Sequence, residues 1–285
     1  MTTEPYTPDA TRWDAFVEWA RRFYIWKDFE EAERNYKLEL GDALAQTRET
    51  FLKDHPEWQG SLEQALKHQK NNLTGGGNWR LRNHFITLLS TRRPLIADAL
   101  RSVWTPVDKP DRDRVRGFVE TVAPGKLGSS ESMASFLLMA LDARQHPFYR
   151  WKPLYKACQM TGYPRANMQW APHKKYAHAL DFLEEFTKQA ASRELEVRDQ
   201  LDAQSLVWCV TTEDYFADEW PSDIRDELNR YRQSKGEPLD APSHDSDPGL
   251  SPDWDAVARE LSWDPGQLAE LVADLEDKRQ MVFYG

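Results

Sequence analysis

Apolar side chains recur every three or four residues along most of this chain, which is the spacing of amphipathic α-helices. The pattern is clearest between residues 173 and 192, where one helical face carries Tyr176, Leu180, Leu183, Phe186 and Ala190. Helices with a single apolar face must bury that face against other helices. The chain is therefore predicted to be mainly α, with a multi-helix globular body.

Further helices are expected at 11–24, 28–54, 61–69, 79–90, 94–104, 111–121, 130–141, 152–160 and 214–234. Thr11 is the expected N-cap of the first helix. Residues 206–210 are five consecutive apolar residues, which fit either a buried helix turn or a strand.

The composition changes after Lys235, where Pro, Gly, Ser and Asp become frequent. Such a change is typical of a linker. We expect a helical recognition or adaptor domain at 1–235, an acidic linker at 236–250, and a short helix–strand segment at 251–285. A boundary inside the first domain would fall near 71–78 or 105–130.

The formal net charge of -10 is concentrated near the C-terminus. Residues 236–285 hold twelve acidic and three basic side chains, so residues 1–235 are close to neutral. The acidic balance therefore does not exclude an anionic partner for the body. Because the chain has no long apolar run and no signal peptide, we expect a cytoplasmic protein without a membrane partner.

Motifs that carry chemistry are scarce. Gly75-Gly-Gly77 lacks the Lys-Ser/Thr pair that follows the glycines of a phosphate loop. The histidines lack the i, i+4 spacing of a helical metal site, and Cys158 and Cys209 are expected to be buried apolar residues. We expect no catalytic residue, no metal ligand and no cofactor in this part of the protein, and hence no enzyme activity.

The C-terminal residues carry a family resemblance. Residues 264–280 have the caps and the period of a helix, and Lys278-Arg279 lead into the apolar run Met281–Gly285. The string 275–285 resembles the approach to the AAA+ motor of McrB-type restriction proteins, in which a helix, a basic turn and a strand ending in Tyr-Gly run into the nucleotide loop. Residues 136–142, 147–149, 161–164 and 201–208 are similar, more weakly, to N-terminal regions of bacterial McrB-like proteins.

This resemblance implies that the chain is the N-terminal region of a McrB-like AAA+ (P-loop NTPase) restriction or antiphage protein, ending just before the Walker A loop. Gly285 would then be the first glycine of that loop. ATP or GTP with Mg would bind only in the motor domain that follows. The implied protein partners are this motor and a nuclease or effector subunit.

Two basic groups are candidate nucleic-acid contacts. The first combines arginines with an amide and an aromatic ring: Asn78, Trp79, Arg80, Arg82, Arg92, Arg93 and Arg101. The second is thinner and alternates with aromatic residues: Lys152, Lys156, Lys174 and Lys175. Arginine can fork onto phosphates and aromatic rings can stack on bases. The ordinary alternative is that these cations form the solvated face of amphipathic helices.

The function expected from these observations is non-catalytic target recognition, with DNA contact, in a modification-dependent restriction or antiphage system. The alternative is an adaptor domain that recruits a sensor or effector subunit without binding nucleic acid, and the near-neutral body fits it. Among the twelve tryptophans, Trp13, Trp19, Trp208 and Trp254 are expected in the core. The alternative to packing is an aromatic pocket that holds a flipped modified base, for which the sequence nominates no particular residue.

Overall fold

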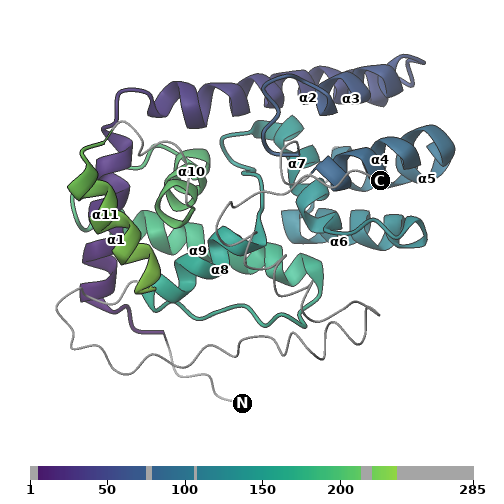
Figure 1. Ribbon diagram of the computed structural model, residues 1–285. Helices are drawn as coiled ribbons and strands as arrows, with labels where there is room; N and C mark the ends of the chain where they lie inside the picture. Colours follow the sequence, from purple (N-terminus) through teal and green to yellow (C-terminus); the bar gives the residue numbers. More distant parts are fainter. Residues whose placement is uncertain (1–5, 75–78, 106–107, 213–219, 236–285) are drawn as a thin grey trace, which may run out of the picture. The chain divides into compact units, whose positions relative to one another are not determined.

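The computed structural model describes residues 6–74, 79–105, 108–212 and 220–235 (Figure 1). The chain divides into two units, Met1–Leu239 and Asp240–Gly285, and all described residues belong to the first. Every regular element among them is a helix. None of these helices is long and apolar enough to cross a membrane.

The helices follow one another along the chain with short connections. They are α1 (Ala10–Tyr24), the π-helix η1 (Glu30–Asn35), α2 (Tyr36–Leu52), α3 (Trp58–Leu66), α4 (Trp79–Thr91), α5 (Arg93–Trp104), α6 (Asp111–Val122), the 3-10 turn η3 (Ala123–Gly125), α7 (Ser130–Asp142), α8 (Trp151–Thr161), α9 (Pro172–Ala191), α10 (Gln200–Thr211) and α11 (Ser222–Gln233).

The mainly helical fold predicted from the periodicity is confirmed for the described residues. Residues 206–210, which the sequence left open between helix and strand, are helical and lie inside α10. The expected N-cap of α1 is wrong: Asp9 caps the helix instead, and its carboxylate accepts a hydrogen bond from the Arg12 N–H at 3.2 Å. The predicted linker, the predicted helix–strand segment with Gly285, and Asn78 lie outside the described residues.

Two helices form the centre of the body. α7 packs against α2, α5, α6 and α9, while α10 packs against α1, α8, α9 and η1. Most residues of both helices are buried, including small and polar residues such as Ser135 and Ser205. A helix that is buried on nearly all sides cannot show the one-sided pattern of a surface helix. This burial explains why the apolar residues at 206–210 are consecutive and do not show the periodicity of an amphipathic helix.

Close approach fixes α2 against α7. A Cβ on Gly41 would lie 2.7 Å from the Cβ of Ala143, just beyond the end of α7, so only glycine fits at this point of α2. In Figure 1, α2 extends from the side of the molecule that holds α1 and α10 toward the side that holds α4 and α5. α2 therefore spans the body from the helices α1 and α10 to the helices α4 and α5.

Several arginines serve the fold by donating to the carbonyl groups at helix ends. Arg114 on α6 donates from Nη1 to the carbonyl of Val103 at 2.6 Å, near the end of α5. Arg232 on α11 donates from Nε to the carbonyl of Val210 at 3.0 Å, near the end of α10. The last carbonyls of a helix have no partner within it and carry its negative dipole end. The side chains of Arg114 and Arg232 are therefore buried in the body and serve the fold.

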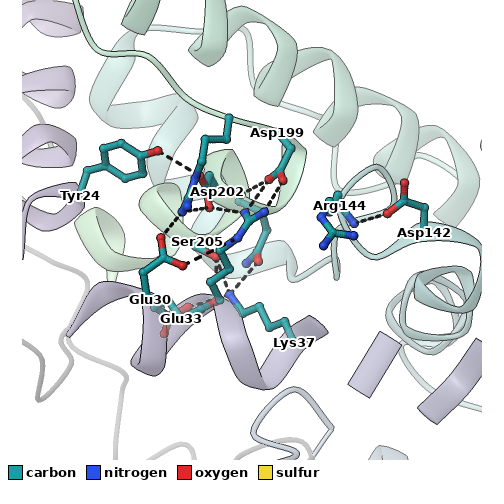
Figure 2. Close-up of polar contacts among 12 residues, drawn as sticks. Tyr24, Glu30, Glu33, Lys37, Asp142, Arg144, Asp199, Asp202 and Ser205 are labelled. Atoms are coloured by element: carbon teal, nitrogen blue, oxygen red, sulfur yellow. Dashed lines mark hydrogen bonds and ion pairs between the residues drawn. The ribbon is translucent and has the colours of Figure 1, made fainter. Parts of the chain in front are cut away.

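A buried lysine joins α2 to α10 (Figure 2). The Nζ of Lys37 donates to Glu33 at 2.7 Å, to Gln204 at 3.1 Å and to Ser205 at 2.8 Å. Three donors meet three acceptors, which is the full hydrogen-bonding capacity of an ammonium group. The charge is therefore satisfied although the side chain is only 1% exposed.

A second set of buried charges surrounds the first turn of α10 (Figure 2). Arg34 of η1 donates to Asp199 at 2.7 Å and to Asp202 at 2.6 Å. Arg198 donates to Asp202 at 2.5 Å, and Tyr24 of α1 donates to the same carboxylate at 3.2 Å. Arg34 lies in the π-helix η1, a rare and wider form of helix. The network fastens α1 and η1 to α10.

Because of this network, the free energy of unfolding should depend on pH in the acidic range. Burial alone would raise the pKa of Asp199, but hydrogen bonds from Arg34 and from the Asp202 N–H outweigh it, so its pKa lies below the ordinary value. A carboxyl with a depressed pKa stabilises the fold above its unfolded pKa of about 3.9, and this contribution is lost as pH falls through the folded pKa. Urea unfolding between pH 6 and pH 3 should show the stability difference between wild type and Asp199→Asn shrinking at the acid end. A difference that stays constant with pH would contradict this result.

Both cysteines are free and buried. Burial raises the pKa of the Cys158 thiol to about 12. At neutral pH this thiol is protonated, and a protonated thiol is a poor nucleophile. The structure therefore places Cys158 in the packing of α8 rather than in a reactive site.

Candidate functional site

The first predicted basic group is spread over α4 and α5, and much of it contacts the protein itself. Arg93 lies over the Trp58 ring at 5.3 Å. Arg101 pairs with Asp98 at 2.7 Å, and Arg92 donates to the Pro124 carbonyl at 3.0 Å. Arg82 is half-buried, whereas Trp79 and Arg80 are exposed and lie together, with 5.5 Å between the guanidinium and the ring. These residues do not line any of the three hollows described below.

The second predicted group divides between neighbouring hollows on α8 and α9. Lys152 and Lys156 line one cleft, and Lys174 lines a separate groove. Lys175 lies between them, with its Nζ 5.1 Å from the centre of the Trp151 ring. The structure therefore brings these four lysines to adjoining hollows, although not to one pocket.

The first hollow, here called the basic cleft, has a volume of about 530 Å³. The start of α7, the start of α8 and the end of α10 form its walls. Its lining residues are Ser129, Glu131, Ser132, Arg150, Trp151, Lys152, Pro153, Lys156, Trp208, Thr211 and Thr212. The volume lies in the range of small-molecule and nucleotide sites.

Cations outnumber acids in the basic cleft. Arg150, Lys152 and Lys156 line it together with one carboxylate, Glu131. Arg150 is held in place by hydrogen bonds from Nη2 to the carbonyls of residues 72 and 73, at 2.7 and 2.9 Å. Its guanidinium lies 4.5 Å from the centre of the Trp208 ring. A fixed cation over an indole face presents charge and an aromatic surface at the same place.

The helix ends add to this positive character. Both α7 and α8 start at the cleft, and neither has a side-chain cap on its first N–H groups. Ser129, the residue before α7, has a left-handed backbone with φ of 49°. Unpaired N–H groups and the helix dipole favour an anion near a helix start. The backbone and the side chains of the cleft therefore favour the same kind of ligand.

The second hollow, here called the α6–α9 groove, has a volume of about 400 Å³. It is lined by Arg112, Arg116, Trp170, His173, Lys174, Ala177, His178 and Asp181. Burial lowers the pKa of His173, and the charges of Arg116 and Lys174 lower it further. The lowered pKa favours the neutral form of His173, and two arginines and one lysine bring positive charge to the groove.

A third, small cavity along α8 and α9 has lining residues in common with both hollows. Its volume is about 10 Å³, room for about one water molecule. It shares Trp151 with the basic cleft and His178 with the α6–α9 groove, and Lys175 also lines it. The two larger hollows are therefore neighbours on one stretch of the molecule.

Part of this site could not be expected from local sequence. Arg112 and Arg116 are on a predicted helix, but nothing nearby in the chain indicates that they face Lys174. Trp208 was expected in the core; it is half-buried and lines the cleft. One local feature of the sequence pointed to this site. It is the alternation of lysines with aromatic residues around Lys152, Lys156, Lys174 and Lys175.

Nothing in the described residues provides a metal centre, since no group of three or more His, Cys, Asp or Glu side chains is arranged to hold an ion. The chemistry that the hollows offer is the binding of anionic and aromatic ligands. No known protein family, curated protein or solved structure matches the chain.

Proposed function

We propose that the helical body recognises DNA, and that the basic cleft is its point of contact. The observation that carries this proposal is the combination in one cleft of three cations, two tryptophans and two uncapped helix starts. Phosphate groups would take the lysines and the helix N–H groups, while a base would take an indole face. No group in the cleft needs to react for this function.

The wider setting of the proposal comes from the sequence. The resemblance of residues 275–285 to McrB-type proteins supports a role as the non-catalytic recognition module of an AAA+ NTPase in a modification-dependent restriction or antiphage system. Binding of ATP or GTP and cleavage of DNA would then belong to the motor and to a nuclease or effector subunit.

Removing the two lysines of the cleft tests the proposal. For Lys152→Ala/Lys156→Ala, the slope of log K against log salt should become shallower by about 1.8 on a duplex, since each lost phosphate contact removes about 0.9. Fluorescence anisotropy would measure this slope with plain duplex, duplex containing methylated cytosine, and single-stranded DNA of the same sequence. A difference between the two duplexes would show whether the modification is read.

A matched control changes the same charge elsewhere. Lys53 and Lys188 are 69% and 63% exposed, and each pairs with a glutamate one turn away on its helix. Lys53→Ala/Lys188→Ala should leave the slope unchanged. If none of the three DNAs binds at low salt, where phosphate contacts are strongest, the proposal is wrong.

An adaptor function is the second candidate, and one observation favours it. Met168 and Trp170, in the connection between α8 and α9, are 66% and 38% exposed. Exposed Met and Trp side chains are enriched at protein interfaces. Under this reading the partner would be a sensor or effector subunit, and Trp170→Ala would weaken its binding while DNA binding would be absent.

A further inference from the structure

Aromatic rings and cations alternate along the path from the basic cleft to the α6–α9 groove. Trp208 faces Arg150 at 4.5 Å in the cleft, and Trp151 faces Lys175 at 5.1 Å beside the small cavity. At the groove, the Trp170 ring lies edge-on to His178, with 5.7 Å between ring centroids. Each step of the path thus offers a ring beside a charged or ionisable group.

The rings are placed in hollows rather than on a raised surface. Trp151 and Trp208 line a cleft of about 530 Å³, and Trp170 lines a groove of about 400 Å³. A base can reach such a ring only when it is unstacked from its neighbours. In a duplex the bases stack on each other and show only their edges, whereas the bases of a single strand can be splayed onto aromatic side chains.

Acidic side chains offset part of the positive charge along the path. Glu131 lies in the cleft, Asp181 lies in the groove, and Asp113 pairs with Arg116 at 3.5 Å. A protein that holds a duplex by its phosphates needs many cations without competing acids. A path that combines cations, some of them offset by acids, with several aromatic rings can draw part of its affinity from stacking, as single-strand binding grooves do.

From this juxtaposition we propose that the ligand is a single-stranded nucleic acid, whose bases contact Trp208, Trp151 and Trp170 in turn while its phosphates contact the lysines between them. The inference rests on the proposed function and narrows its ligand to an unpaired strand. DNA and RNA share this chemistry, and the test below separates them.

The test compares three labelled ligands of one mixed sequence on the full chain at about 50 mM salt: a 12-nucleotide DNA strand, the same strand as RNA, and the 12-base-pair DNA duplex. Fluorescence anisotropy should show a strand binding ~10-fold or more tightly than the duplex, with quenching of tryptophan emission as bases stack. Equal or tighter binding of the duplex would overturn the inference and leave the proposed function intact. Binding of RNA alone would keep the strand path but remove DNA as the ligand, and binding of none would overturn both.

A pair of tryptophan variants tests the path itself. Trp170 lies in the groove and is 38% exposed, while Trp79 lies on α4 outside the hollows and is 49% exposed. Both can be truncated without opening the core. Trp170→Ala should weaken strand binding ~10-fold and Trp79→Ala should not, because only the first removes a stacking surface. Equal effects of the two substitutions would contradict the path.

Discussion

Replacing Lys37 with methionine is expected to lower the free energy of unfolding by about 3–5 kcal/mol. Methionine keeps the apolar stem of the side chain but removes the charge that compensates the carboxylate of Glu33, which is itself only 3% exposed. It also leaves Gln204 and Ser205 without the donor that now reaches both. Removing one partner of a buried ion pair leaves the other charge buried, which is costly. Urea unfolding followed by circular dichroism measures the loss.

A second Glu–Lys pair, at the C-terminal end of α2, is the matched control. Glu49 and Lys53 have the same i, i+4 spacing, but their side chains are 66% and 69% exposed. Lys53→Met should cost no more than about 0.5 kcal/mol, because water screens an exposed pair. The double variant Glu33→Leu/Lys37→Met should recover part of the lost stability, since an apolar pair can replace a buried ion pair, although Gln204 and Ser205 still lack their donor. Equal losses for the two single lysine variants would contradict the prediction.

The contrast between these two pairs also shows what the sequence can and cannot predict. Residues 28–54 are charged and helix-favouring, and the helix prediction for them is confirmed by η1 and α2. Nothing local tells the buried pair from the exposed pair, because both are a glutamate followed four residues later by a lysine. The difference comes from Gln204 and Ser205, more than 160 residues further along the chain. Local sequence features predict that a segment is helical. Whether one of its ion pairs is buried depends on which other helix packs against it.

The two basic groups illustrate the same limit. From their number in the sequence, the arginines of residues 79–104 are expected to form a positively charged surface. In the structure Arg93 lies over an indole ring, Arg101 pairs with an aspartate, and Arg92 donates to a carbonyl. The thinner lysine group lines hollows because α8 and α9 start next to each other there. Arginine's five donors and planar shape suit it to contacts inside the protein, so its number in a sequence says little about the charge left on the surface.

The placement of arginine bears on function as well as on fold. Arg114 and Arg232 donate to helix ends, and Arg34 donates to the buried aspartates. Other cations, such as Lys152 and Lys174, line the hollows, where they can meet an anionic ligand. The near-neutral balance of residues 1–235 is thus compatible with a local anion-binding surface.

Asp202 is the acceptor on which the second buried network converges. Its side chain is 0% exposed and receives hydrogen bonds from Arg34 at 2.6 Å, Arg198 at 2.5 Å and Tyr24 at 3.2 Å. Arg34 keeps Asp199 as a partner and Arg198 keeps Glu30, so both arginines retain some compensation without it. Removing Asp202 should therefore lower stability by weakening the packing of α1 and η1 against α10, and not only by breaking one ion pair.

Replacing Asp202 with alanine is accordingly expected to lower the free energy of unfolding by about 3–5 kcal/mol, because the buried guanidinium of Arg34, whose side chain is only 9% exposed, loses one of its carboxylate partners, and Arg198, 41% exposed, loses the same partner. For a body of this size the midpoint of thermal unfolding should fall by about 10 °C, at 2–4 °C for each kcal/mol. Asp98→Ala is the control, since Asp98 also pairs with an arginine at 2.7 Å but is 65% exposed. Its midpoint should stay within about 3 °C of wild type. If differential scanning calorimetry gave the two variants the same midpoint, the network around Asp202 would not be what fastens α10 to η1.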